Sequence, residues 1–183
     1  MIGKGKSISH GTAALEYDLA KEIDGQTAAI EIARHELYGC TGAEMVQEMK
    51  PYHADFPNVK NNCLRFEVSP SIEESATFTD ADWAELGNDF MQRMGLANHQ
   101  YIIIRHSGTE SKKEQAHLHI LANRVSLSGE LYRDNWIGKK ATEAANAIAK
   151  ERNFVQSQDI GKANKAEIKE AMDDVLKKMQ GFD

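Results

Sequence analysis

The stretch that decides the fold is residues 100–125, QYIIIRHSGTESKKEQAHLHILANRV. It opens with a β-branched run, Ile102 to Ile104, and after a polar loop it alternates in character from Ala116 to Arg124. Both patterns are typical of strands, and the polar loop between them fits a hairpin. We therefore predict two antiparallel strands, 101–106 and 116–124.

Three histidines occupy this predicted hairpin. His117 and His119 are two residues apart, so on a strand they point to the same face, about 7 Å apart at the backbone. Leu118 and Ile120 then face the other way, where they can pack on helices. His106 ends the preceding strand, and a hairpin places it beside the other two. Three converging imidazoles with open positions predict a catalytic metal site.

Hydrophobic periodicity outlines the rest of the fold. One more strand is predicted at 63–68, where Leu64, Phe66 and Val68 alternate with polar residues. Helices are predicted at 11–22 (stripe Thr12, Leu15, Leu19, Ile23), from Thr41 to Pro51, from Thr79 to Gly95, beyond Gly129, and through 168–179, with 157–161 as a linker. We expect an α/β (α+β) fold: an antiparallel sheet of about five strands, helices packed on one face, and the metal site on the open face.

Composition limits the classes of function. The net charge of −6 argues against nucleic-acid binding by bulk electrostatics, so any such binding must use local patches. Candidate residues are Lys4, Lys6, Arg105, Asn123, Arg124, Arg133, Lys139 and Lys140. The sequence contains neither a membrane-spanning apolar run nor a secretory signal pattern, which favours a soluble cytoplasmic protein. Cys40 and Cys63 are expected to be reduced thiols.

The histidine stretch resembles the three-histidine motif of plasmid mobilisation relaxases. The resemblance rests on 100–106 and 117–125, with Ser128-Gly129 following. Residues 8–17, ISHGTAALEY, are similar to the family segment that carries the catalytic tyrosine in an Ala-Leu-x-Tyr context. The resemblance extends over roughly residues 1–155.

The resemblance implies a metal-dependent DNA nickase. His106, His117 and His119 would bind a divalent cation, magnesium or manganese, that polarises the scissile phosphate. Tyr17 would attack the phosphorus, leaving a 5′ phosphotyrosyl bond and a free 3′ hydroxyl. The implied partners are single-stranded and hairpin DNA at an origin of transfer, together with accessory mobilisation proteins and a coupling protein.

Carboxylates are the expected helpers of this chemistry. Glu67, on the predicted strand 63–68, resembles the family's acidic residue that orients a metal ligand. Many relatives also carry an acidic residue two positions after the first histidine, whereas Gly108 stands there in this chain. Glu110 is the candidate substitute. The nucleophile has a rival in His10, because some relatives use histidine instead of tyrosine.

Several alternatives stay open at this point. The domain is expected at 1–155, followed by a helical extension at 156–183 that would continue in a longer relaxase. A catalytically inactive DNA-binding accessory protein would keep the same fold. A replication-initiator nickase would share the histidines and the tyrosine chemistry. A cupin-like metal protein fits less well, because no glutamate follows the histidine pair and many helices are predicted.

Overall fold

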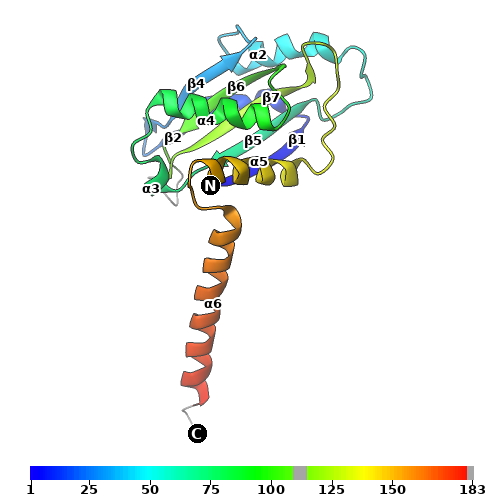
Figure 1. Ribbon diagram of the computed structural model, residues 1–183. Helices are drawn as coiled ribbons and strands as arrows, with labels where there is room; N and C mark the ends of the chain where they lie inside the picture. The colour runs from blue at the N-terminus through cyan, green and yellow to red at the C-terminus, as the bar shows by residue number, and fades with distance from the viewer. Residues whose placement is uncertain (109–114, 181–183) are drawn as a thin grey trace.

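A five-stranded antiparallel sheet forms the centre of the molecule (Figure 1). The computed structural model describes residues 1–108 and 115–180. The strands stand in the order β1-β5-β7-β6-β4. They are β1 (Ile2–Ile8), β4 (Ala29–His35), β5 (Cys63–Ser69), β6 (His99–His106) and β7 (His117–Ser126), and a separate two-stranded ladder joins β2 (Glu22–Ile23) and β3 (Gln26–Thr27). The predicted α+β fold with about five antiparallel strands is confirmed.

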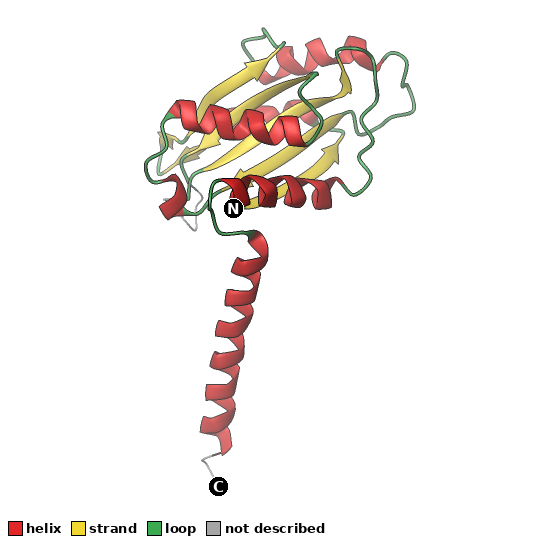
Figure 2. Cartoon of the chain, viewed as in Figure 1, coloured by secondary structure: helices red, strands yellow, loops and turns green. Residues whose placement is uncertain are grey.

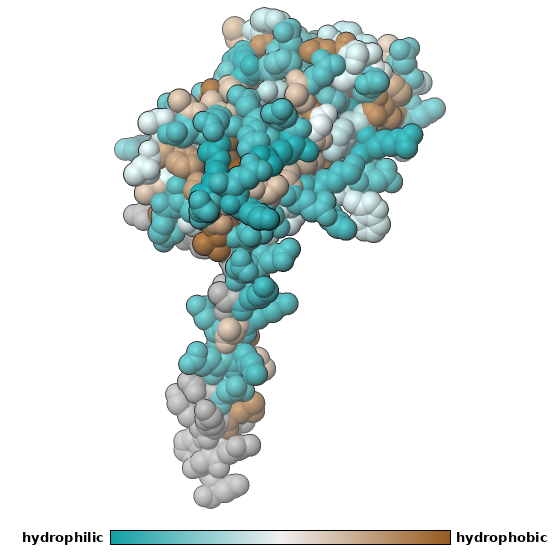
Figure 3. All heavy atoms as spheres, in the orientation of Figure 1, coloured by the Kyte–Doolittle hydropathy of each residue, from teal (hydrophilic) through white to brown (hydrophobic). Residues whose placement is uncertain are grey.

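Two helices cover one face of the sheet and two others cover part of the second face. The described helices are α1 (Gly11–Leu19), α2 (Gly42–Met49), α3 (Ile72–Ser75), α4 (Asp80–Arg93), α5 (Ile137–Glu151) and α6 (Ser157–Gln180), with a 3₁₀ turn η1 (Lys50–His53). Figure 2 shows α4 and α5 in front of the sheet. Their outward surfaces are mostly hydrophilic in Figure 3, as expected of amphipathic helices.

The main core lies between the sheet and the helices α4 and α5. Phe66, Leu118 and Ile120 point from β5 and β7 into this core and are at most 1% exposed. They meet Trp83 and Phe90 of α4, and the rings of Phe66 and Phe90 pack edge to face. The apolar residues that alternate along these strands therefore face this core, and the residues between them face the opposite side of the sheet.

A second, smaller core separates α1 and α2 from the other face of the sheet. Leu15 and Met45 pack there against Ile104 and Leu121 of the central strands. We had expected this second face to be open. Two N-terminal helices, α1 and α2, cover one part of it. Leu121 and His119 share this face, so the histidine pair lies at the margin of the α1 and α2 layer.

The sequence prediction differs from the structure in three further places. Strands β1 and β4 were not predicted: β1 has glycines at alternate positions, and β4 alternates only over Ile30 and Ile32. The segment 157–161 is not a linker but the first turns of α6. The buried side of α1 is formed by Gly11, Ala14, Leu15 and Asp18, so of the predicted stripe Leu15 is buried and Leu19 packs against the core, whereas Thr12 is exposed and Ile23 belongs to β2. A buried aspartate thus replaces an apolar residue on that face.

Helix α6 extends away from the sheet and its covering helices (Figure 1). Its described apolar side chains Ile168, Met172, Val175 and Leu176 are 53 to 60% exposed. Among the described residues, no helix is long and apolar enough to cross a membrane. Both cysteines are free thiols, Cys40 exposed and Cys63 buried.

Candidate metal centre

Strands β6 and β7 bring the three predicted histidines together. His106 stands directly opposite His117 in the antiparallel register, and Ile104 stands opposite His119. One ring nitrogen from each histidine lies within 4.8 Å of the corresponding nitrogens of the other two. The ring centroids of His106 and His119 are 4.4 Å apart, and those of His117 and His119 are 4.9 Å apart. The predicted convergence is therefore present.

Burial favours the neutral form of His106 and His119. His106 and His117 are 2% and 6% exposed. Burial is the main cause that lowers the pKa of His119 to about 2, and the neighbouring charges of His106 and Arg65 lower it further. Burial also lowers the pKa of His106. A neutral imidazole keeps a nitrogen lone pair, which is the form that binds metal ions.

The hydrogen bonds of the triad assign its protons. Nδ1 of His117 donates to the carbonyl of Gln115 at 3.0 Å, which leaves Nε2 of His117 as an acceptor. Nε2 of His119 donates to that acceptor at 3.1 Å. Nδ1 of His119 in turn accepts from the guanidinium of Arg65 at 3.2 Å. In this arrangement every ring nitrogen of the pair is satisfied.

The donor set fits a divalent transition-metal ion. Two nitrogens that each lie about 2.1 Å from one ion stand roughly 3 to 3.5 Å apart. The separation of 3.1 Å between the Nε2 atoms of His117 and His119 meets this condition. Three imidazoles suit zinc, copper, iron or nickel better than magnesium, which prefers oxygen ligands. Residues His106, His117 and His119 are therefore able to hold a metal ion.

Asp18 is the residue of this site that the sequence analysis missed. Its carboxylate is 2% exposed and accepts from Nε and Nη2 of Arg65 at 3.0 and 2.5 Å. The same carboxylate lies 3.8 Å from Nδ1 of His119. Its main-chain carbonyl accepts a hydrogen bond of 2.7 Å from Nε2 of His106. A carboxylate on the apolar side of a helix, next to the candidate nucleophile, is the signal that could have identified it.

Tyr17 lies on α1, the helix that covers this site, and His10 is the residue just before that helix. Tyr17 is 61% exposed, and Nζ of Lys21 lies 5.7 Å from the centre of its ring. His10 precedes α1 as its N-cap residue, is exposed, and makes no side-chain cap bond. Tyr17 immediately precedes Asp18, whose backbone contacts His106. The phenol is therefore accessible from solvent. The next residue in the chain, Asp18, contacts the histidine triad through its main-chain carbonyl.

One predicted carboxylate helper, Glu67, lies beside the triad but pairs with a lysine. Glu67 stands opposite His119 on β5, but its carboxylate accepts a 2.9 Å hydrogen bond from Nζ of Lys4. Glu110 lies outside the described residues. A shallow hollow beside the triad is lined by Lys4, Gly5, Lys6, Arg65, Phe66, Glu67 and His119. This hollow gives the site a positively charged rim on the side of strand β1.

The other predicted DNA-binding residues separate into two groups. Asn123 is fully buried and bonds His53, Met49 and Gln100, so it is not available to a ligand. Arg105 pairs with Asp80 at the start of α4. Arg124 bonds Asp134 and two main-chain carbonyls, which anchors the loop before α5. Arg133 and Lys139 are exposed and Lys140 is partly exposed, all at or before the start of α5.

The sheet thus brings three imidazoles together, and the helix over this part of the sheet carries an exposed tyrosine. The chain belongs to the relaxase family, MobA/VirD2-like, nuclease domain, whose family model matches residues 17–154. This membership confirms the resemblance drawn from the histidine motif. The nuclease domains of this family nick DNA, which is the broad activity that the membership gives.

One solved structure extends the comparison. The conjugative relaxase TrwC, in its metal-bound complex with oriT DNA, is 14% identical in sequence, with a TM-score of 0.43 over 82% of this chain and 69% of that chain. No curated protein is significantly similar to this chain.

Proposed function

We propose that this protein nicks one strand of plasmid DNA at an origin of transfer, in the cytoplasm, and holds the cut end covalently. The observation that carries the proposal is the position of exposed Tyr17 immediately before Asp18, whose carbonyl and carboxylate reach two of the three clustered histidines. The membership of the relaxase family supports the substrate class. His106, His117 and His119 would hold the cation.

The proposed reaction is a transesterification. Oη of Tyr17 attacks the scissile phosphorus, a bond from Oη to phosphorus forms, and the bond from phosphorus to the 3′ oxygen breaks. The phenolic proton is lost and the leaving 3′ oxygen takes up a proton, so charge and atoms balance. When bound, the cation supplies Lewis-acid polarisation of the phosphate. The phosphotyrosyl product conserves the energy of the broken bond, so the nick can be resealed.

Side chains around the triad have separate parts in this proposal. Lys4 and Lys6, on the rim of the hollow, would bind the phosphates that flank the scissile bond. Asp18 is proposed as the positioning residue for His119, in the role that the sequence first suggested for Glu67. Glu67, already bonded to Lys4, would instead hold that lysine toward the backbone of the DNA.

The test is covalent capture of DNA. Purified protein is incubated with manganese and labelled single-stranded oligonucleotides tiled across the replicon that encodes it, and products are separated on a denaturing gel. We expect a protein-linked band that disappears in Tyr17→Phe and in His119→Ala. Tyr38→Phe is the matched control. Tyr38 is also exposed, but it lies in the loop between β4 and α2, where its hydroxyl bonds Glu36.

Each result decides between the alternatives. A band that survives Tyr17→Phe contradicts the tyrosine assignment and makes His10 the next nucleophile to test. If wild-type protein binds the oligonucleotides but forms no band with any metal ion, the protein is a catalytically inactive accessory factor. A band formed only with sequences from a replication origin would favour a replication-initiator nickase.

A further inference from the structure

The loop between β7 and α5 exposes a tryptophan that packing does not explain. Trp136 is 80% exposed, whereas Trp83 in the main core is 2% exposed. Tryptophan is the largest side chain and is usually mostly buried, so an indole this exposed is unusual. Its φ of 58° and ψ of 28° lie in the left-handed region, which favours glycine or asparagine. It makes no side-chain cap bond to the helix that follows.

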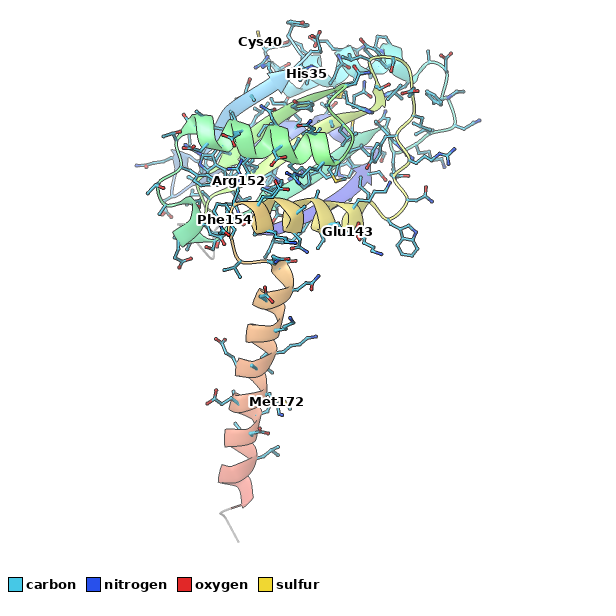
Figure 4. All side chains as sticks on the ribbon, viewed as in Figure 1. His35, Cys40, Glu143, Arg152, Phe154 and Met172 are labelled. Carbon is cyan, nitrogen blue, oxygen red and sulfur yellow. The ribbon has the colours of Figure 1, made fainter. Side chains whose placement is uncertain are left out.

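Positive charges surround this indole. Trp136 lines a shallow hollow together with Lys139, Lys140 and Glu143. Glu143, labelled on α5 in Figure 4, is 3.8 Å from Nζ of Lys139. Lys140 reaches back over the ring of Tyr132, with its Nζ 5.0 Å from the ring centre. The immediate surroundings of the indole are thus two lysines and one glutamate, not an apolar patch.

A second hollow adjoins the first and adds another aromatic ring. Tyr132, Lys140 and Glu143 line this second hollow, so Lys140 and Glu143 are common to both. Nζ of Lys140 also donates to the carbonyl of Arg133, which holds the lysine next to the ring of Tyr132. Aromatic rings that alternate with cations are the arrangement that binds single-stranded nucleic acid, since bases stack on the rings and phosphates pair with the cations.

This surface is continuous with the rim of the metal centre around strand β1. Helix α5 packs along β1 (Figure 1). A side chain built at Gly138, two residues after Trp136, would place its Cβ 3.5 Å from the carbonyl oxygen of Gly5. Gly5 itself lines the hollow that contains Lys4, Lys6 and His119. Because α5 lies on the face of the sheet opposite the histidines, a strand of DNA that leaves the metal centre would reach the start of α5 by passing round the edge of the sheet at β1.

We propose that Trp136 is a stacking platform for one unpaired base of single-stranded DNA, with Lys139 and Lys140 contacting the adjacent phosphates. The proposal rests on the proposed DNA-nicking function and deepens it by naming a second contact for the same strand. Unpaired DNA is the expected occupant because a base inside a duplex has no free face to offer an indole. The neighbouring lysines match the phosphate charge of such a strand.

Tryptophan fluorescence gives a direct test, because Trp83 is buried and Trp136 is exposed. Full-length wild-type protein is titrated with a short oligothymidylate, and binding is followed in parallel by anisotropy of the labelled oligonucleotide. We expect the oligonucleotide to quench wild-type fluorescence. In Trp136→Phe the quenching should disappear while most of the affinity remains, because phenylalanine keeps a ring. Trp136→Ala should bind about 10-fold more weakly, as expected for the loss of one stacked base.

Matched controls separate stacking from other effects. Tyr38→Ala removes a ring that is 76% exposed but bonded to Glu36, and it should bind as wild type does. Stacking is contradicted if Trp136→Ala keeps wild-type affinity, if quenching persists in Trp136→Phe, or if wild-type protein binds no oligonucleotide. A blunt duplex that quenches as strongly as the single strand also contradicts it, as does quenching by an acidic peptide of equal charge.

The covalent assay distinguishes this proposal from the proposed function. At saturating oligonucleotide, Trp136→Ala should form the protein-linked band at the wild-type rate, because Trp136 is separate from the reacting atoms. Loss of the band at saturation would contradict a role confined to binding. If Tyr17→Phe retains the band but the Trp136 variants behave as expected, the nucleophile assignment fails while the stacking site stands.

Discussion

The carboxylate of Asp18 lies 3.8 Å from Nδ1 of His119, with the guanidinium of Arg65 between them. Arg65 donates to this Nδ1, so His119 carries its proton on Nε2. Metal binding through Nε2 would require that proton to move to Nδ1, where it needs an acceptor. Asp18 is the acceptor at hand, and it is held in place by Arg65.

Asp18→Asn should therefore weaken metal binding. The amide loses the negative charge that favours a protonated Nδ1, and it leaves Arg65 without its ionic partner. Changes to such supporting partners lower metal affinity about 10-fold or more. Calorimetric titration with manganese measures the effect directly.

Glu67→Gln is the control for the Asp18 variant, because Glu67 stands opposite His119 but bonds Lys4. Its manganese affinity should stay within about 2-fold of the wild-type value, which is small compared with the effect of a lost supporting partner. Equal losses in both variants would mean that the general negative charge near the triad matters, not the contact between Asp18 and His119.

The histidine triad could be predicted from the sequence, but the contact that its carboxylate makes with it could not. His106, His117 and His119 lie on two strands joined by one loop, so a period of two residues and a hairpin suffice to bring them together. Asp18 reaches them from a helix that is 88 residues away from His106 in the chain. That contact depends on how α1 packs over the sheet, which no local pattern encodes.

Strand β1 was missed for a related reason. Its sequence, Ile2-Gly3-Lys4-Gly5-Lys6, has glycines where a strand usually has branched side chains. In the structure those glycines face α5: a Cβ at Gly3 would lie 2.4 Å from the carbonyl oxygen of Ala141. Close packing against a helix more than 130 residues later requires glycine at these positions. The segment therefore has a low local β propensity, although it forms a strand.

The substitution Gly3→Ala should accordingly destabilise the fold. The added methyl would also lie 2.6 Å from Cβ of Ala145, so α5 would have to move away from β1. Overpacking of this kind costs about 1 to 3 kcal/mol. Urea unfolding followed by circular dichroism measures the loss. Gly161→Ala is the matched control, since a Cβ at Gly161 meets nothing within 4 Å, and it should leave the unfolding midpoint unchanged.

Acidification should lower stability through His99, which is distant in the chain from the triad ligands. Burial lowers the pKa of His99. The hydrogen bond from its Nδ1 to the carbonyl of Asn123 raises the pKa, but by less than burial lowers it. A neutral His99 in the folded state thus stabilises the protein above the unfolded pKa near 6.5. That stability is lost as the pH falls below this value toward the folded pKa.

We therefore expect the free energy of unfolding to be lower at about pH 5.5 than at about pH 7.5. The measurement is the difference in urea-unfolding free energy between the two pH values, in a chelating buffer, for wild type and His99→Gln. The variant should show a smaller pH dependence. An identical pH dependence in both proteins would show that His99 is protonated equally in the folded and unfolded states.

The two cysteines should differ in reactivity. Burial raises the pKa of the Cys63 thiol to about 11, and this side chain is 0% exposed beneath Gly11 of α1. The thiolate is the reactive form, so Cys63 should resist alkylation in the folded protein. Cys40 is exposed and should react with iodoacetamide at once. Mass spectrometry of peptides after a short labelling pulse, with and without urea, checks this. Fast labelling of Cys63 without urea would mean that α1 opens readily.

Helix α6 should be dispensable for the fold, in keeping with a nicking domain at 1–155 and a helical extension at 156–183. Met172 lies on α6 far from the sheet in Figure 4, and it is 60% exposed. Ser157, at the start of the helix, bonds the side chain of Asn146 through its main-chain N–H and its hydroxyl. A chain shortened to residues 1–158 keeps these bonds. Its thermal midpoint should lie within about 2 °C of the full-length value, and its manganese affinity should not change. A fall of about 5 °C or more in the midpoint would make α6 part of the cooperative unit and move the domain boundary beyond it.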